Sequence, residues 1–130
     1  MPPDGTSRTI LVVEDEWLLR DELAHAFRAE RWGVLEAATG EAAVTLLRDN
    51  CVDALLTDIQ LGGHLSGWDV AEAGRAVNAA IKIIYISGDG VDRSRQVSAS
   101  CFFKKPYRPA TIVAACRSLC GQQNASASGA

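Results

Sequence analysis

Polar residues that could do chemistry follow four short apolar runs of the sequence. The runs cover residues 10–13, 54–56, 83–86 and 101–103, and the polar residues beyond them are Glu14, Asp15, Asp58, Ser87 and Lys105. If the runs are parallel strands of one sheet, these residues lie along the edge where open α/β sheets bind ligands. Crowded carboxylates repel one another, and a cation such as Mg²⁺, which prefers oxygen ligands, relieves that repulsion. A cation beside an ammonium and a hydroxyl is typical of a site for a phosphoryl group.

The composition is typical of one globular domain. The 130 residues are 48% hydrophobic and 22% charged, which supplies enough apolar material for a core. The net charge of −3 comes without the basic stripe that nucleic-acid backbones require, so we expect no direct nucleic-acid binding. The first residues lack the apolar core of a signal peptide, and no run approaches the length of a membrane span. We therefore expect a cytoplasmic protein without membrane contact.

The cysteines form no recognisable disulfide or metal pattern. Cys51, Cys101, Cys116 and Cys120 include no C-x-x-C pair, and each lies in or beside an apolar segment. Free cysteine commonly behaves as a small core residue. We expect buried thiols rather than a disulfide frame or a zinc site.

Helical and extended patterns alternate along the chain. Extended apolar segments are expected at residues 10–13, 34–38, 54–56, 81–86 and 101–103, and helices at 16–31, 39–50, 67–77 and 109–120. Ser66, with Asp69 three residues later, is typical of a capping box before the third helix. The stretch 88–96 is polar and contains weak helix formers, so we expect a loosely held helix there, which makes five in all.

Five short apolar strands that alternate with helices predict a doubly wound parallel sheet with helices on both faces. Right-handed crossovers allow few topologies, and the strand order 2-1-3-4-5 is one of them. In that order the first and third strands are neighbours. Glu14, Asp15 and Asp58 would then meet where the strand order reverses.

The order and separation of these motifs resemble the receiver domain of two-component response regulators. The motifs are an acidic doublet after the first strand, one Asp after the third, a Ser after the fourth and Lys-Pro after the fifth. The resemblance covers about residues 8–121 and implies a flavodoxin-like fold with a phosphoacceptor aspartate, here Asp58. We expect a receiver domain at 9–121, between a flexible N-terminus at 1–8 and a disordered tail at 122–130.

The resemblance also implies a Mg²⁺ site, with Mn²⁺ as a substitute. Asp15 and Asp58 would bind the cation directly, the backbone carbonyl of Gln60 would complete the protein ligands, and Glu14 would act through a metal-bound water. A carboxylate is a weak nucleophile toward a phosphoryl group, so the transfer depends on positioning and on neutralising the charge of the phosphoryl oxygens.

Three further residues take roles from the resemblance. Ser87 would bind a phosphoryl oxygen, and Lys105 would pair with the phosphate, with a cis peptide bond between Lys105 and Pro106. Phe102 would move together with Ser87 as part of a switch. Taken singly, each also has an ordinary structural explanation, as a strand-end cap, a solvated charge or a core aromatic.

The loop after Asp58 departs from the family pattern. Receivers typically carry Met-Pro shortly after the phosphoacceptor and a Gly eight residues after it. Here Leu61-Gly62-Gly63 replaces that segment, and Gly67 falls nine residues after Asp58. The glycines permit backbone angles closed to other residues. Gln60 and Asp89 occupy the positions where the family tunes the lifetime of the phosphoryl group.

The resemblance implies two protein partners, one that donates the phosphoryl group and one that responds to the phosphorylated chain. The donor would be a phosphohistidine on a sensor histidine kinase or a histidine phosphotransfer protein, and the chain would phosphorylate itself rather than act as an enzyme on other substrates. No effector follows residue 121 in this sequence, so we expect a stand-alone receiver that contacts an unknown downstream protein. One domain of a larger protein would show the same sequence. The surface of segments 88–96, 101–103 and 109–121 is the usual contact face and could also form a homodimer.

Two other classes of protein share parts of this pattern. A phosphatase of the haloacid-dehalogenase type also uses an aspartate nucleophile and Mg²⁺, but it requires Asp-x-Asp after the first strand, and Trp17 stands at the second acid position. A degenerate receiver would act as a binding module without phosphate. The retention of Asp15, Asp58, Ser87 and Lys105 argues against that alternative.

Overall fold

The structure, a computed structural model, describes residues 8–88 and 90–129, with side chains described as far as Cys120. The strands in this part of the chain are β1 (Thr9–Val13), β2 (Gly33–Ala37), β3 (Ala54–Asp58), β4 (Lys82–Ser87) and β5 (Ser100–Lys104). The helices are α1 (Trp17–Ala29), α2 (Gly40–Asp49), α3 (Gly67–Val77) and α4 (Pro109–Gly129). The expectations for residues 1–7, Asp89 and Ala130 lie outside the described residues.

All five strands are parallel and lie in the order β2-β1-β3-β4-β5, which confirms the predicted flavodoxin-like sheet. Val13 pairs with Thr57 across β1 and β3, and Ser87 pairs with Lys104 across β4 and β5. The carboxyl ends of these strands are therefore aligned, and the residues that follow them share one edge of the sheet.

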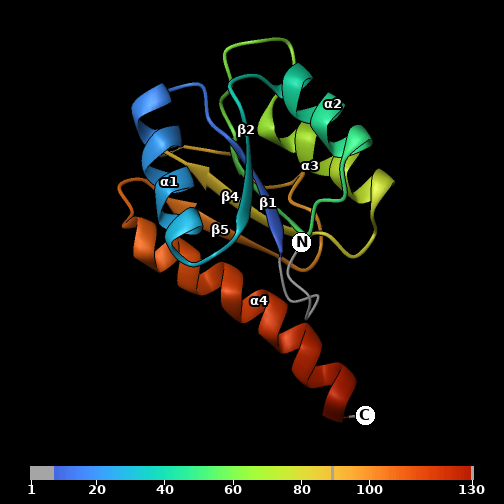
Figure 1. Cartoon of the computed structure of the whole chain (residues 1–130). Coiled ribbons are helices and arrows are strands. Elements are labelled where there is room, and N and C mark those ends of the chain that lie inside the picture. The colour runs from blue at the N-terminus through green and yellow to red at the C-terminus, as the bar shows by residue number, and fades with distance from the viewer. Residues whose placement is uncertain (1–7, 89, 130) are drawn as a thin grey trace.

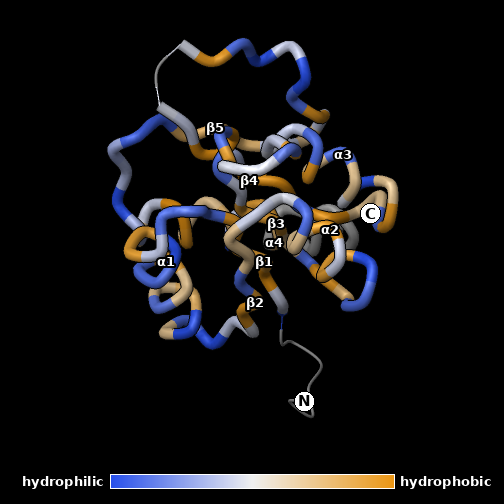
Figure 2. The backbone as a smooth tube through the Cα atoms, turned by 90° about the horizontal axis from the view of Figure 1, so that it is seen from above, coloured by the Kyte–Doolittle hydropathy of each residue, from blue (hydrophilic) through white to orange (hydrophobic). Residues whose placement is uncertain are grey.

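Helices cover both faces of the sheet, with α1 and α4 on one face and α2 and α3 on the other (Figure 1). Successive residues of β1 alternate between the two layers. Ile10 and Val12 belong to the core beneath α1 and α4, whereas Leu11 and Val13 belong to the core beneath α2 and α3. Because both faces are covered, the central strands are apolar at nearly every position, as the hydrophobic centre of Figure 2 shows.

The start of α3 lies directly against the end of β3. The capping box is confirmed, since the Ser66 hydroxyl accepts a hydrogen bond from the Asp69 N–H at 3.3 Å and the Asp69 carboxylate accepts one from the Ser66 N–H at 2.7 Å. A Cβ atom added at Gly67 would lie 2.2 Å from the carbonyl oxygen of Asp58. A glycine is therefore required at position 67, the first residue of α3.

The predicted helix between β4 and β5 is wrong for the residues described there. Residues 90–99 form turns, bends and irregular chain, and side chains from elsewhere in the fold hold them in place. The Tyr85 hydroxyl accepts a hydrogen bond from the Val97 N–H at 3.1 Å. Arg75 of α3 donates to the carbonyls of Ser98 at 2.8 Å and Ala99 at 3.1 Å. The segment has few apolar side chains, so a helix there would bury little apolar surface. These hydrogen bonds to other elements therefore stabilise the segment more than a helix would.

Helix α4 continues to Gly129, whereas the sequence predicts that it ends just before Gly121. The sequence from 122 onward contains alanine and glutamine and no proline, so no residue there forces the helix to stop. Although α4 has 21 residues, neither it nor any other helix in the described chain is apolar enough over its length to cross a membrane.

The cysteines follow the prediction in part. Cys116 and Cys120 are buried and Cys101 is half-buried, all as free thiols. Cys51 is exposed, contrary to expectation, because it lies in the link after α2 rather than in a packed element.

Candidate functional site

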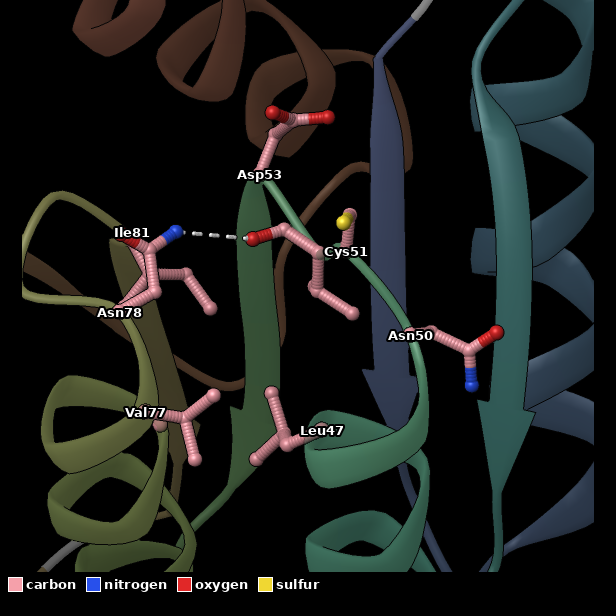
Figure 3. Close-up of a pocket in the computed structure, with 9 residues that line it drawn as sticks. Leu47, Asn50, Cys51, Asp53, Val77, Asn78 and Ile81 are labelled. Atoms are coloured by element: carbon pink, nitrogen blue, oxygen red, sulfur yellow. Dashed lines mark hydrogen bonds between the residues drawn. The ribbon is translucent and has the colours of Figure 1, made fainter.

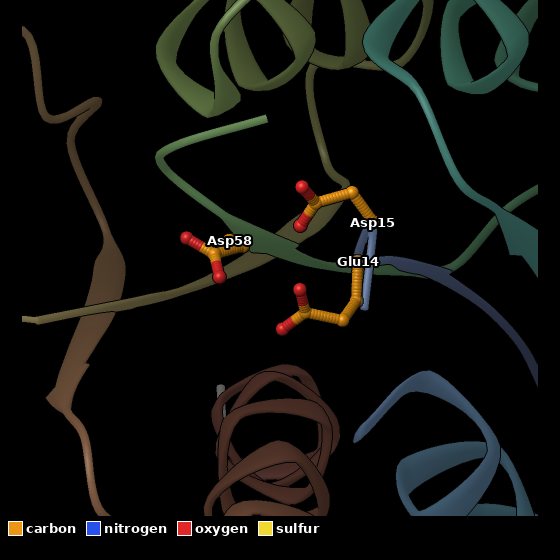
Figure 4. A group of neighbouring side chains, drawn as sticks. All are labelled: Glu14, Asp15 and Asp58. Atoms are coloured by element: carbon orange, nitrogen blue, oxygen red, sulfur yellow. The ribbon is translucent and has the colours of Figure 1, made fainter. Parts of the chain in front are cut away.

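Three carboxylates converge at the carboxyl edge of the sheet (Figure 4). Glu14 and Asp15 follow β1, and Asp58 ends β3, the neighbouring strand. One oxygen from each carboxylate lies within 4.8 Å of the other two. The predicted meeting of these residues at the reversal of the strand order is confirmed.

The three carboxylates differ in burial. Glu14 is 2% exposed and Asp58 is 5% exposed, whereas Asp15 lies at the surface. Burial raises the pKa of Glu14 to about 7, and the charge of Asp58 and a hydrogen bond with Asp15 add to the rise, against a lowering by the Glu16 N–H. The cluster therefore resists full ionisation on its own. Its oxygen-only donor set and negative charge fit a hard divalent cation such as Mg²⁺.

Lys105 supplies positive charge to this cluster. Its Nζ atom lies 2.6 Å from Asp58 Oδ2 and 3.6 Å from Glu14 Oε1. Burial lowers the pKa of Lys105, but the hydrogen bond to Asp58 and the charges of Asp58 and Glu14 outweigh this effect and raise it above the ordinary value. The lysine is therefore cationic near neutral pH. The peptide bond between Lys105 and Pro106 is cis, as the resemblance implies.

The second oxygen of Asp58 is also held. Asp58 Oδ1 accepts a hydrogen bond from the backbone N–H of Gln60 at 3.0 Å, so the loop after β3 fixes the orientation of the carboxylate. This contact places Gln60 beside the predicted phosphoacceptor. Asp89, the other residue predicted to tune phosphoryl lifetime, lies outside the described residues.

Ser87 presents an unused hydroxyl at the end of β4. The residue is fully buried, and its hydroxyl oxygen has no hydrogen-bond partner among the described residues. Leaving a buried hydroxyl unsatisfied costs about 1–3 kcal/mol. The backbone of Ser87 is fixed, because its carbonyl accepts a hydrogen bond from the Lys105 N–H at 2.8 Å. A buried, unpaired hydroxyl held next to Lys105 suits a residue that binds an added group.

Phe102 lies in an aromatic cluster beneath α3. Its ring centroid is 6.4 Å from that of Trp68 and 6.4 Å from that of Tyr85, and the Arg93 guanidinium lies 4.2 Å from its centre. Phe103 packs on the opposite face of the sheet. Phe102 therefore lies on the side of segment 90–99, as a switch residue requires, and its role as a switch stays a prediction.

Two residues that the sequence did not single out lie near the site. The Arg20 guanidinium on α1 donates to the carbonyl of Glu14 at 2.8 Å and pairs with Glu36. The Tyr107 hydroxyl is buried without a partner among the described residues, and burial, followed by the charge of Glu14, raises its pKa. The position of Tyr107 directly after Lys105-Pro106 is the one local signal that could have drawn attention to it.

A second concavity lies at the opposite edge of the sheet, between the ends of α2 and α3 (Figure 3). Leu47, Val77 and Ile81 give it an apolar lining, and Asn78 donates to the carbonyl of Val52 at 3.3 Å. Among the described residues, its lining brings no three possible metal-binding side chains together. The carboxyl edge is therefore the candidate site.

Comparison with known proteins agrees with the fold. Residues 10–117 match the family model of the response regulator receiver domain. The chain belongs to this family.

Individual relatives show how the chain compares with whole proteins. The probable transcriptional regulatory protein TcrX of Mycobacterium tuberculosis is 30% identical over 120 residues, which are 89% of this chain and 51% of the relative. The aerobic respiration control protein ArcA of Escherichia coli K12 is 28% identical over 112 residues, which are 85% of this chain and 47% of the relative. The chain thus spans about half the length of these relatives. Among solved structures, a response regulator receiver protein from Sinorhizobium medicae WSM419 matches with a TM-score of 0.83 and 27% identity, covering 88% of this chain and 94% of that chain.

Proposed function

We propose that Asp58 accepts a phosphoryl group from a phosphohistidine on a sensor histidine kinase or a histidine phosphotransfer protein. The P–N bond of the donor breaks, an O–P bond to the Asp58 carboxylate forms, and the leaving imidazole takes up a proton. The observation that carries this proposal is the placement of a buried carboxylate 2.6 Å from the Lys105 ammonium, within a cluster of three acids. A phosphoryl acceptor needs this arrangement because the incoming group brings negative charge.

The acidic residues would hold Mg²⁺, or Mn²⁺ in its place. Asp15 and Asp58 would be direct ligands, with the backbone carbonyl of Gln60, and Glu14 would contribute through a bound water. The cation would neutralise charge on the phosphoryl oxygens. The cation would matter most for Glu14. Burial raises the pKa of this carboxyl group to about 7, so without a positive charge nearby it is only partly ionised at neutral pH.

After transfer, Lys105 would pair with the phosphoryl group instead of the free carboxylate, and the Ser87 hydroxyl would donate to a phosphoryl oxygen. Ser87 suits this role because its hydroxyl is buried without a partner among the described residues. Its movement would be followed by Phe102 and by the segment 90–99, which side chains rather than a helix hold in place. This segment, with β5 and α4, would form the surface read by a downstream protein or by a second copy of the chain.

The acyl phosphate would also be lost by hydrolysis, so the signal would be timed by the protein itself. Gln60 and Asp89 would set that lifetime. The chain would catalyse only its own phosphorylation and dephosphorylation and would not turn over a separate substrate. A phosphatase of the haloacid-dehalogenase type is not favoured, because Trp17, at the position of the second acid, is an exposed indole.

Incubation with acetyl phosphate and Mg²⁺, followed by intact mass measurement, tests the proposal. The wild type should gain one phosphoryl group in a Mg²⁺-dependent manner, and Asp58→Asn should gain none. Asp49→Asn, which changes an exposed carboxylate at the end of α2, is the matched control and should be labelled like the wild type. Labelling of Asp58→Asn at the wild-type level would contradict the assignment.

A further inference from the structure

The loop between β3 and α3 passes over the acidic cluster. A Cβ atom added at Gly62 would lie 3.6 Å from Asp15 Oδ2, so the backbone there is within one side-chain atom of the exposed carboxylate. Two residues earlier, the Gln60 N–H donates to Asp58 Oδ1 at 3.0 Å. The conformation of this loop therefore decides what surrounds two of the three carboxylates.

A side chain from α2 holds the middle of the loop. Glu41 Oε2 accepts a hydrogen bond from the backbone N–H of His64 at 3.2 Å. A Cβ atom added at Gly63 would lie 2.9 Å from Glu41 Oε1, so the carboxylate rests directly on the glycine backbone. Glu41 is itself well placed, because the Thr39 hydroxyl caps the helix by accepting from the Ala42 N–H at 3.1 Å. The contact joins a rigid helix to a loop that contains two consecutive glycines.

Consecutive glycines have more backbone freedom than any other pair of residues. Fixing a loop residue when a ligand binds costs conformational entropy, and this cost weakens binding. A loop that is already fixed when a ligand arrives avoids that loss of entropy. We propose that Glu41 is a positioning residue for the cation site: by holding the His64 N–H it keeps Gly62 over Asp15 and Gln60 beside Asp58 before the cation binds. This inference rests on the proposed function, because it assigns Glu41 a role at the same cation site.

Amide hydrogen exchange of the cation-free protein and calorimetric titration with Mg²⁺ test this role. Glu41→Ala should speed exchange of the amides from Gly62 to Leu65 and raise the Kd for Mg²⁺ about three- to tenfold, the effect expected from the loss of one solvent-exposed hydrogen bond of ordinary strength. Glu41→Gln keeps an acceptor oxygen and should restore most of both effects. Asp49→Ala removes a carboxylate of the same helix far from the loop and should behave as the wild type.

A second variant disturbs the same contact from the loop side. The backbone at Gly63 is not left-handed, so in Gly63→Ala the new methyl group is opposed mainly by the Glu41 carboxylate, which it displaces. The Gly63→Ala effect on Mg²⁺ affinity should match that of Glu41→Ala, and the double variant should be no weaker than either single variant.

The outcomes separate this inference from the proposed function. Unchanged Mg²⁺ affinity in both Glu41→Ala and Gly63→Ala would overturn the positioning role, as would an equal loss in Glu41→Gln, which would indicate that charge rather than the hydrogen bond acts. If the wild type itself shows no Mg²⁺ binding, the proposed cation site fails. Phosphorylation of the wild type is measured separately by intact mass.

Discussion

The Lys105 ammonium lies 2.6 Å from Asp58 Oδ2, an ion pair that joins the end of β5 to the end of β3 across the intervening strand β4. The aspartate is 5% exposed on its side chain and the lysine 31%, so the pair is largely but not fully removed from water. Lys105 also neutralises Glu14, at 3.6 Å. One side chain therefore balances two buried carboxylates.

Replacement of Lys105 should destabilise the protein. Removing one partner of a fully buried ion pair costs about 3–5 kcal/mol, and because Lys105 is partly solvated we expect Lys105→Ala to lower the free energy of unfolding by about 1–3 kcal/mol. Urea denaturation at neutral pH without Mg²⁺ measures the change. Lys82→Ala, at the opposite edge of the sheet, is the control. Equal stability of the two variants would mean that the ion pair contributes nothing.

Glu14 should make the cation-free protein less stable as pH rises from about 4.5 to about 7. Its pKa is raised from 4.5 to about 7 in the folded state, so between these values the unfolded chain has lost the proton that the folded protein retains. Raising the pH therefore favours unfolding within this window and has no further effect above it. Glu14→Gln should remove this part of the pH dependence, on the order of 3 kcal/mol, in denaturation curves from pH 4 to pH 8. Parallel pH profiles for wild type and variant would contradict the raised pKa.

Mg²⁺ should raise the melting temperature by relieving repulsion within the acidic cluster. Binding at one hundred times the Kd stabilises a protein by about 2.7 kcal/mol. Asp15→Ala removes the exposed ligand and should abolish most of the shift, whereas Asp21→Ala, an exposed carboxylate on α1, should leave it intact. An undiminished shift in Asp15→Ala would place the cation elsewhere.

The positions of Glu14, Asp15 and Asp58 could be predicted from the sequence because they depend on two regular features. Apolar runs mark buried parallel strands, and right-handed crossovers leave few strand orders. Together these features determine which strand ends are neighbours. The degree of burial that raises the pKa of Glu14 could not be read in this way, because it depends on how helices pack over the edge of the sheet.

The segment between β4 and β5 could not be predicted because its structure depends on residues distant in sequence. Arg75 and Tyr85 hold residues 97–99 through carbonyl and amide groups, which any residue type would offer. Local propensity indicated only that a helix there would be weak. The contact of Glu41 with the Gly62-Gly63 loop was hidden for the same reason, although the glycines themselves marked the loop as unusual.

Ser87→Ala should separate phosphorylation from its consequence. The hydroxyl is buried and unpaired among the described residues, so its removal should raise the free energy of unfolding of the free protein, by up to about 1–3 kcal/mol. Phosphorylation of Asp58 should persist, but the slowing of amide exchange that beryllofluoride or phosphate produces in residues 90–103 should weaken. A charge-assisted hydrogen bond of about 1.5–3 kcal/mol would shift a balanced equilibrium more than tenfold. An identical exchange response in the variant and the wild type would show that the coupling bypasses Ser87.

The most direct test of the central claim is to locate the phosphoryl group. Borohydride reduces an aspartyl phosphate to homoserine, so treatment of the phosphorylated protein followed by peptide mass spectrometry marks the acceptor residue. We predict homoserine at position 58, formed only when phosphodonor and Mg²⁺ are both present. Homoserine at position 15, or the absence of any reduced residue in a protein that has gained phosphate, would contradict the assignment of Asp58 as the acceptor.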